Sequence, residues 1–344
     1  MSSSADGNPD VDLWMRMISE EGYKSCSVSV AVFVSLVREL AAEAAKLVDT
    51  AADDLIGRIE NLQTLRVIKR SERINGYIKP SDAMWQRVSI YVNDGLWMLL
   101  AELPLLFLSS VTIKTEGTSS PRGDPLMSRK DVIRRTCELL EAYWSGDAPP
   151  SLRDLWYDDK SAQVLIATQL CWRSRQFILA HELGHLLVHA YPERIGEDIT
   201  GTAYRVGRTY VEHLASLNID DDLRRAAYNT WLDEFVADRV ALRICMNLNE
   251  HGGVKQVIAS AVQLALLVTL LIEKLFEVRC GRSLSEVSQE QRKMDHPPTE
   301  MRLEVLRGYI REALPDAFGQ LFEDIANEAC WCISFPGEVA PANR

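Results

Sequence analysis

The sequence predicts a mainly α-helical protein, and three observations support this fold class. Long stretches rich in Ala, Leu, Glu and Lys, which favour helix, follow one another along the 344 residues. One short segment has the character of a strand, and the chain shows no internal repeat. Hydrophobic residues make up 47% of the chain and charged residues 25%, a balance typical of globular proteins with a substantial core.

Charge and cysteine usage narrow the class of protein further. The chain has 38 basic and 49 acidic side chains and a net charge of −11, the wrong sign for neutralising phosphates, so we expect no nucleic-acid partner. Its polar start, MSSSADGNPDVD, lacks the basic and apolar segments of a signal peptide. The seven cysteines are odd in number and scattered, as expected for reduced thiols. We therefore expect a cytoplasmic protein.

The N-terminal part is expected to hold a flexible tail over residues 1–10 and a helical region of unknown role over residues 11–114. Val28 to Gln63 has the composition of one or two helices. Trp85 to Ile113 is apolar but interrupted, which predicts buried helices broken near Pro104. Residues 115–125 are rich in Gly, Ser, Thr and Pro and predict a linker between two domains.

Residues 126–344 form the second expected domain, with helices predicted at 129–145, 171–190, 222–249, 255–279 and 298–313. A short strand is predicted from Gln163 to Ala167. Gln256 to Ile272 has no charged residue, but its 17 residues are fewer than the roughly 20 that a membrane-spanning helix needs. It predicts a buried central helix, with a short or tilted membrane segment over about 257–272 as the alternative.

The sequence HELGH, residues 181–185, is the motif that carries chemistry. In a helix, His181 and His185 lie about 40° apart on one face, close enough to bind one metal ion. Zinc accepts two imidazoles readily, and the carboxylate of Glu182 can take a proton from water that such a metal activates. The flanking apolar residues predict that this helix is buried.

A catalytic zinc site needs a third protein ligand, and WLDEFVADR, residues 231–239, offers one. Glu234 and Asp238 are four apart and share one face of a second helix, where the small Ala237 allows close approach of the first. Glu234 can complete the coordination, and Asp238 can accept the second ring N–H of a histidine ligand. The plainer alternative is a solvated acidic face, since Asp233 is acidic too.

These residues resemble the gluzincin zinc metallopeptidases, in which HExxH is followed on a later helix by ExxxD or ExxAD. Here HELGH and EFVAD are separated by 48 residues. A third element, DHPPTEMR at residues 295–302, resembles the HP(P)xxxR box of HtpX-like and CaaX-endopeptidase-like gluzincins and of soluble phage-exclusion Lit-type peptidases. The resemblance covers roughly residues 160–313. Val188 and Tyr191 stand where the metzincin motif has Gly and His, which disfavours that class.

The resemblance implies a zincin-like domain with a small strand element, which hydrolyses peptide bonds of a protein or peptide substrate. It implies zinc ligands at His181, His185 and Glu234, with Glu182 as the general base. By the same resemblance Asp238 supports a ligand from behind, and His296 and Arg302 lie near the substrate cleft. The chain lacks the paired hydrophobic spans of membrane-bound members, so a membrane-embedded substrate is not expected.

Other histidines and tyrosines of the chain are open to more than one interpretation. His189 is expected to be a core or surface residue rather than a ligand. His296 either caps the helix that begins near Pro297, or donates a hydrogen bond to a reaction intermediate, or fills the open metal position at rest. The tyrosines between the two motifs could supply the same hydrogen bond, namely Tyr204, Tyr210 and Tyr228.

Three functions remain open at this stage. The first is a zinc endopeptidase. The second is a regulated sensor or toxin-like module, such as one for phage defence, in which residues 1–125 hold a latent peptidase domain. The third is a helical scaffold that zinc stabilises without catalysis. The oligomeric state is not predicted.

Overall fold

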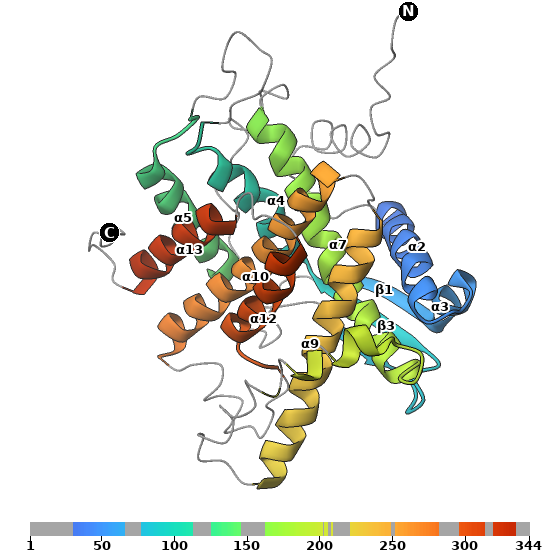
Figure 1. The fold of residues 1–344 in the computed structure, drawn as a ribbon. Helices are drawn as coiled ribbons and strands as arrows, with labels where there is room; N and C mark the ends of the chain where they lie inside the picture. The colour runs from blue at the N-terminus through green and yellow to red at the C-terminus, as the bar shows by residue number, and fades with distance from the viewer. Residues whose placement is uncertain are drawn as a thin grey trace, which may run out of the picture.

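The computed structural model describes residues 30–65, 77–112, 125–145, 162–201, 203–205, 208, 221–248, 252–281, 296–313 and 319–334. These residues are mainly helical, which confirms the predicted class (Figure 1). The helices are α2 (Val30–Leu47), α3 (Ala52–Arg58), α4 (Asp94–Leu108), α5 (Arg129–Ser145), α7 (Ala162–Ala190), α9 (Asp221–Asn247), α10 (Gly252–Cys280), α12 (Thr299–Ala313) and α13 (Gly319–Ser334).

The N-terminal region, predicted as helical, contains the helices α2, α3 and α4 but also a small mixed sheet that was not predicted. Its strands are β1 (Ile59–Leu65), β2 (Tyr77–Pro80) and β3 (Val88–Asn93), in the order β1-β3-β2. β3 pairs in parallel with β1 and antiparallel with β2. Val88, Ile90 and Val92 of the central strand are buried, as expected of a strand that is covered on at least one face.

Two predicted breaks in secondary structure are also corrected. Pro104 lies inside α4 and does not end that helix. The start of α4 is fixed by Asn93, whose side chain accepts hydrogen bonds from the backbone N–H groups of Gly95 and Leu96. The strand predicted at Gln163 to Ala167 is instead the first part of α7, because this segment continues without a turn into the helix that carries HELGH.

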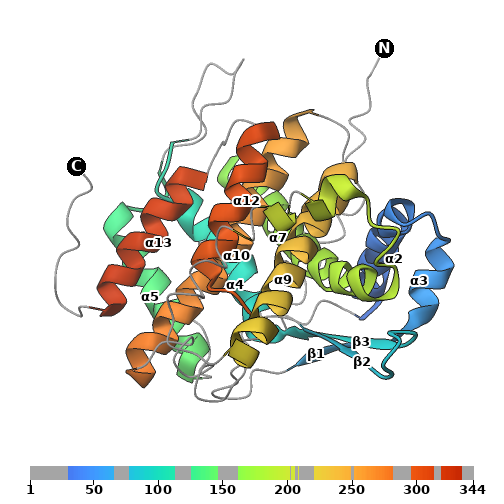
Figure 2. The same cartoon turned by 60° about the horizontal axis from the view of Figure 1, so that its bottom comes forward.

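The five helices predicted downstream of residue 126 are confirmed as α5, α7, α9, α10 and α12, although α7 begins nine residues earlier than expected. α13 was not predicted. α10 lies at the centre of the molecule, against α4, α7, α12 and α13, as both overall views show (Figures 1 and 2). Within the described ranges it is the one helix long and apolar enough to cross a membrane, and 78% of its apolar window is buried. The predicted buried central helix is therefore confirmed.

One hydrophobic core joins the two parts of the chain. Buried residues of α2, α4 and β3 belong to the same cluster as buried residues of α7, α9, α10, α12 and α13. α4 and α2 both pack directly on α7, so the first part of the chain supports the helix of the HELGH motif. The tail predicted at residues 1–10 and nearly all of the predicted linker lie outside the described residues.

Candidate metal centre

The centre is built where α7 and α9 pack against each other at very short range. A Cβ atom added to Gly184 would lie 2.9 Å from the carbonyl oxygen of Ala237 and 3.2 Å from its Cβ. Only a glycine facing a small residue allows this approach without a shift of one backbone. The expected role of Ala237 is confirmed, and the glycine of HELGH is its partner.

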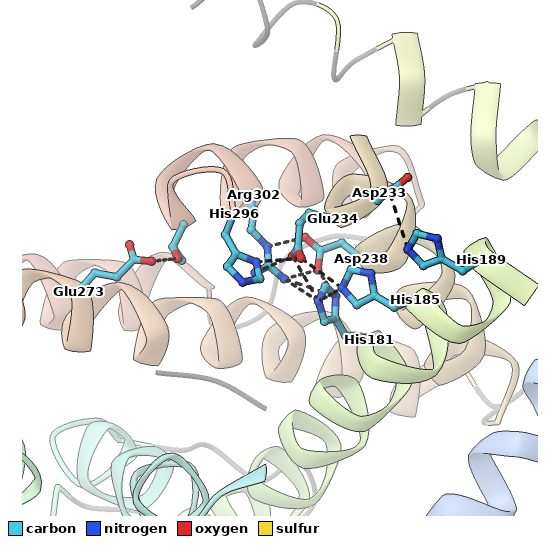
Figure 3. A network of polar contacts seen from close by, with 10 residues as sticks. His181, His185, His189, Asp233, Glu234, Asp238, Glu273, His296 and Arg302 are labelled. Atoms are coloured by element: carbon cyan, nitrogen blue, oxygen red, sulfur yellow. Dashed lines mark hydrogen bonds and ion pairs between the residues drawn. The ribbon is translucent and has the colours of Figure 1, made fainter. Parts of the chain in front are cut away.

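Three potential ligand atoms converge at this crossing. His181 Nε2 lies 3.1 Å from His185 Nε2 and 3.4 Å from Glu234 Oε2, and His185 Nε2 lies 3.2 Å from the other carboxylate oxygen, Glu234 Oε1. His181 and Glu234 are buried, and the side chain of His185 is 14% exposed. Figure 3 shows these side chains pointing toward one another from α7 and α9. The group His181, His185 and Glu234 could hold a metal ion.

The size and chemistry of this triangle fit a single tetrahedral ion. Ligand atoms at about 2.05 Å from a tetrahedral zinc lie roughly 3.3 Å apart. The two imidazole nitrogens are 3.1 Å apart, and each lies within 3.4 Å of one of the two Glu234 oxygens. Glu234 Oε2 is buried and accepts no hydrogen bond of ordinary geometry, although Arg302 Nη1 and His181 Nε2 lie 3.3 Å and 3.4 Å from it. Two imidazole nitrogens and a carboxylate are a ligand set that zinc accepts. A bound ion would therefore add a direct bond to a buried oxygen whose described contacts are ion pairs only.

Asp238 and Arg302 orient the first histidine from behind. Asp238 Oδ1 lies 2.9 Å from His181 Nδ1, so a proton on that nitrogen leaves Nε2 free to face the ligand triangle. Arg302 Nε and Nη2 donate to the two oxygens of Asp238 at 2.9 Å and 2.7 Å. The predicted supporting role of Asp238 is consistent with this geometry. Arg302, expected near a substrate cleft, is instead buried and engaged with Asp238 and Glu234.

The charges of this group shift the pKa values of its members. Burial and the charge of Arg302 oppose protonation of His181, but the carboxylates of Asp238 and Glu234 outweigh them and raise its pKa to about 10. Burial opposes ionisation of Glu234, yet His296, His185 and Arg302 hold the pKa of this carboxyl well below its usual range. Without a metal, the group is thus a buried ion-pair network.

His296 lies on the solvent side of this group. Its Nδ1 is 2.8 Å from Glu234 Oε1, and its side chain is 64% exposed. The negative charge of Glu234 is the main cause that raises the pKa of His296. α12 begins three residues later, at Thr299, whose hydroxyl donates to Glu273 of α10 at 2.5 Å. His296 therefore contacts the carboxylate of Glu234, one of the three candidate ligands, which the role of a simple helix cap would not require.

Glu182 is buried beside the ligand triangle, with 3% of its surface exposed. Burial raises the pKa of its carboxyl, whereas the charges of His181 and His185 act in the opposite direction. A carboxyl with a raised pKa is a stronger base once it is ionised. Burial and the neighbouring imidazoles therefore act in opposite directions on the ionisation of Glu182.

A second group of side chains lies one helical turn from His185. The ring of His189 stacks on the indole of Trp85, with centroids 4.2 Å apart, and its Nε2 lies 3.7 Å from Asp233 Oδ2. His189 does not belong to the ligand triangle, in line with the sequence-based expectation. Burial lowers the pKa of His189 and raises that of Asp233.

Trp85 was not identified from the sequence, because it lies about 100 residues before His189 in the loop between β2 and β3. Asp233 was noted only as a further acidic residue of α9. Of the candidate tyrosines, Tyr204 is near enough to Asp233 and Tyr228 for their charges to help raise its pKa, after burial. Tyr210 lies outside the described residues.

Comparison of the chain with known protein families, with curated proteins and with solved structures finds no match.

Proposed function

We propose that the chain is a zinc-dependent endopeptidase of the gluzincin type. The observation that carries this proposal is the convergence of His181, His185 and Glu234, whose potential ligand atoms lie within 4.8 Å of one another, with Glu182 buried beside them. A bound zinc would supply Lewis-acid polarisation of a peptide carbonyl and of the attacking water. Its ligands would be the three residues of the triangle.

Other residues of the centre transfer the proton or hold the ligands in position. Glu182 accepts a proton from the attacking water on its carboxylate and passes it to the nitrogen of the leaving amine. Arg302 and Asp238 keep the proton of His181 on Nδ1 and so hold its ring in one orientation. His296 Nδ1 holds the Glu234 carboxylate from the solvent side, where a peptide would enter.

The expected partner is a protein or peptide substrate, and we propose a cytoplasmic location for the reaction. Among the members of the centre, His296 is the most exposed side chain and His185 is partly exposed, which supports access from this side. His181, Glu182 and Glu234 are buried, so little water reaches them from elsewhere.

A second candidate is the regulated module, in which the N-terminal region controls a latent peptidase. The observation that favours it is the direct packing of α2, α4 and β2 on α7, the helix that carries both histidine ligands. Because α4 and α7 share one core, deleting residues 1–125 would unfold the protein rather than release the activity. Substitutions at the surface of the β2–β3 loop test this candidate better than truncation.

Metal content is the first test of the proposed function. Elemental analysis of the full chain is expected to give about one zinc per molecule in the wild type and in Glu182→Gln, and none in His185→Ala. His189→Ala is the matched control, since it removes an imidazole one turn away that lies outside the triangle. A well-folded wild type that takes up no zinc after reconstitution would overturn the metal centre.

Catalysis is tested on the same proteins with a proteome-derived peptide mixture and mass-spectrometric detection of new termini. We expect cleavage by the wild type and a loss of at least about a hundredfold in Glu182→Gln, because general-base catalysis contributes roughly 10²–10⁴-fold. If Glu182→Gln retained zinc and cleaved at the wild-type rate, its assignment as the base would be wrong. Zinc content without cleavage in either protein would favour the scaffold.

A further inference from the structure

Two partly exposed polar side chains lie beside the metal centre, near the C-terminal end of α7. His189 and Asp233 are 34% and 30% exposed and lie next to His185 and Glu234 along their helices. Figure 3 shows the two side chains on the side of the ligand triangle opposite His296. A substrate bound across the centre would therefore meet Asp233 close to the bond that is cleaved.

The carboxylate of Asp233 has little positive charge close to it. Among the described residues, the basic side chain within ion-pair distance is His189, whose Nε2 lies 3.7 Å away, beyond normal hydrogen-bond length. The neighbouring carboxylate of Glu234 is also negative. A partly buried carboxylate in such a place favours a cationic group from outside, and the side chain of Asp233 is 30% exposed.

The wall beside Asp233 is rigid and aromatic. The indole of Trp85 lies nearly parallel to the ring of His189, with an interplanar angle of 16°. The backbone of Trp85 has a φ of 54°, and Asp82 fixes the loop by accepting hydrogen bonds from the backbone N–H groups of Met84, Gln86 and Arg87. Arg58 donates to the carbonyl of Trp85 at 3.1 Å. The loop thus holds the indole of Trp85 against His189 and the hydrophobic core, and the part of this half-buried indole that stays exposed is apolar.

We propose that Asp233, walled by the Trp85–His189 stack, forms a subsite for a basic side chain of the substrate, next to the cleaved bond. This inference rests on the proposed zinc centre and adds the class of residue that the centre selects. A lysine or arginine fits both parts, because its alkyl stem packs on aromatic rings while its charged end pairs with a carboxylate. Asp233 is then a specificity-determining residue that takes no part in the chemical step.

The test measures binding rather than cleavage, with two probes that differ by one ammonium group. Nα-acetyl-lysine hydroxamate and Nα-acetyl-norleucine hydroxamate both bind zinc through the hydroxamate, and their affinities for the zinc-loaded full chain are compared by calorimetry. We expect the lysine probe to bind at least about tenfold tighter. Asp233→Asn should bring this ratio close to one, mainly through weaker binding of the lysine probe. Asp222→Asn, at an exposed site on the same helix, should keep the ratio.

Each outcome decides between the proposals. Equal affinities in the wild type, or a ratio that survives in Asp233→Asn, overturn the subsite. Zinc-loaded protein that binds neither hydroxamate overturns it too. In all of these cases the peptidase proposal still depends on its own cleavage assay. A folded chain without zinc overturns both. Trp85→Leu is a second variant, expected to reduce the ratio several-fold by loosening the wall.

Discussion

The metal centre and the N-terminal sheet share one core, but the ion pairs of the centre are buried and the ion pair at the sheet is exposed to solvent. At the crossing of α7, α9 and α12, the side chains of Arg302, Asp238 and Glu234 are at most 5% exposed and pair with one another. On the sheet, Arg87 pairs with Glu60 at 3.0 Å, but the arginine side chain is 69% exposed. Since buried ion pairs lose far more free energy than exposed ones when one partner is removed, we expect the fold to be more vulnerable to loss of a charge at the centre than at the sheet.

The two regions also differ in how tightly the backbone is packed. α7 and α9 approach so closely at Gly184 that a single added carbon would meet the backbone of Ala237. In α3, beside the sheet, a Cβ at Gly57 would meet nothing within 4 Å. The centre therefore depends on particular small and charged residues, whereas the sheet region tolerates change at comparable positions.

Removal of the buried arginine should have the largest effect. Arg302→Met would leave Asp238 and Glu234 buried without their cation, and we expect the free energy of unfolding to fall by about 3–5 kcal/mol. The matched change in the sheet, Arg87→Met, should cost less than about 1 kcal/mol, because that pair is exposed to solvent. Urea unfolding of both variants in metal-free buffer makes the comparison. Similar losses in the two variants would show that burial of the centre does not matter in the way we argue.

Alanine substitutions at Gly184 and Gly57 should change the free energy of unfolding by smaller amounts and in opposite directions. Gly184→Ala forces α7 and α9 apart, and we expect a loss of about 1–3 kcal/mol in the free energy of unfolding together with weaker zinc binding. Gly57→Ala should be neutral or stabilising by up to about 1 kcal/mol, because alanine favours helix and the site has space. Thermal unfolding and zinc titration measure both. If Gly184→Ala bound zinc as well as the wild type, the close approach would not be needed for the centre.

Local patterns in the sequence predicted the centre well because its parts lie on individual helices. The spacing of His181 and His185, and of Glu234 and Asp238, places each pair on one helix face whatever the rest of the chain does. The apolar segment from Gln256 to Ile272 likewise predicted the buried α10. These features depend on the helical repeat alone, so no knowledge of distant contacts was needed.

The sheet and the Trp85 loop could not be predicted in this way, because they depend on contacts between distant segments. β1 pairs with β3 across more than twenty residues, and Ile59 to Gln63, expected to continue a helix, is a strand only because that partner exists. The position of Trp85 against His189 follows from the same sheet, which packs on α7 through β2. The burial of Arg302 similarly required the approach of α12 to α9.

The smallest expected effect is the pH dependence of zinc affinity. It should depend on the buried centre and not on the sheet region. In the metal-free protein Asp238 and Glu234 raise the pKa of His181 to about 10, so its imidazole is charged at neutral pH. Zinc must displace a proton from the His181 ring, and below the raised pKa its affinity should rise by up to tenfold for each unit of pH. Calorimetric titrations between pH 6.5 and 7.5, repeated in buffers of different ionisation enthalpy, measure the affinity and the protons released.

The stability of the metal-free protein should change with pH in the opposite direction. A histidine with a raised pKa contributes stability that is complete below its unfolded value of 6.5 and is lost as the pH rises toward 10. The stabilisation that zinc confers should therefore grow as the pH increases. Arg87→Met, in the sheet region, should leave both trends unaltered. A zinc affinity that did not change over this range would mean that His181 is already neutral in the metal-free protein, and that the buried carboxylates do not control its charge.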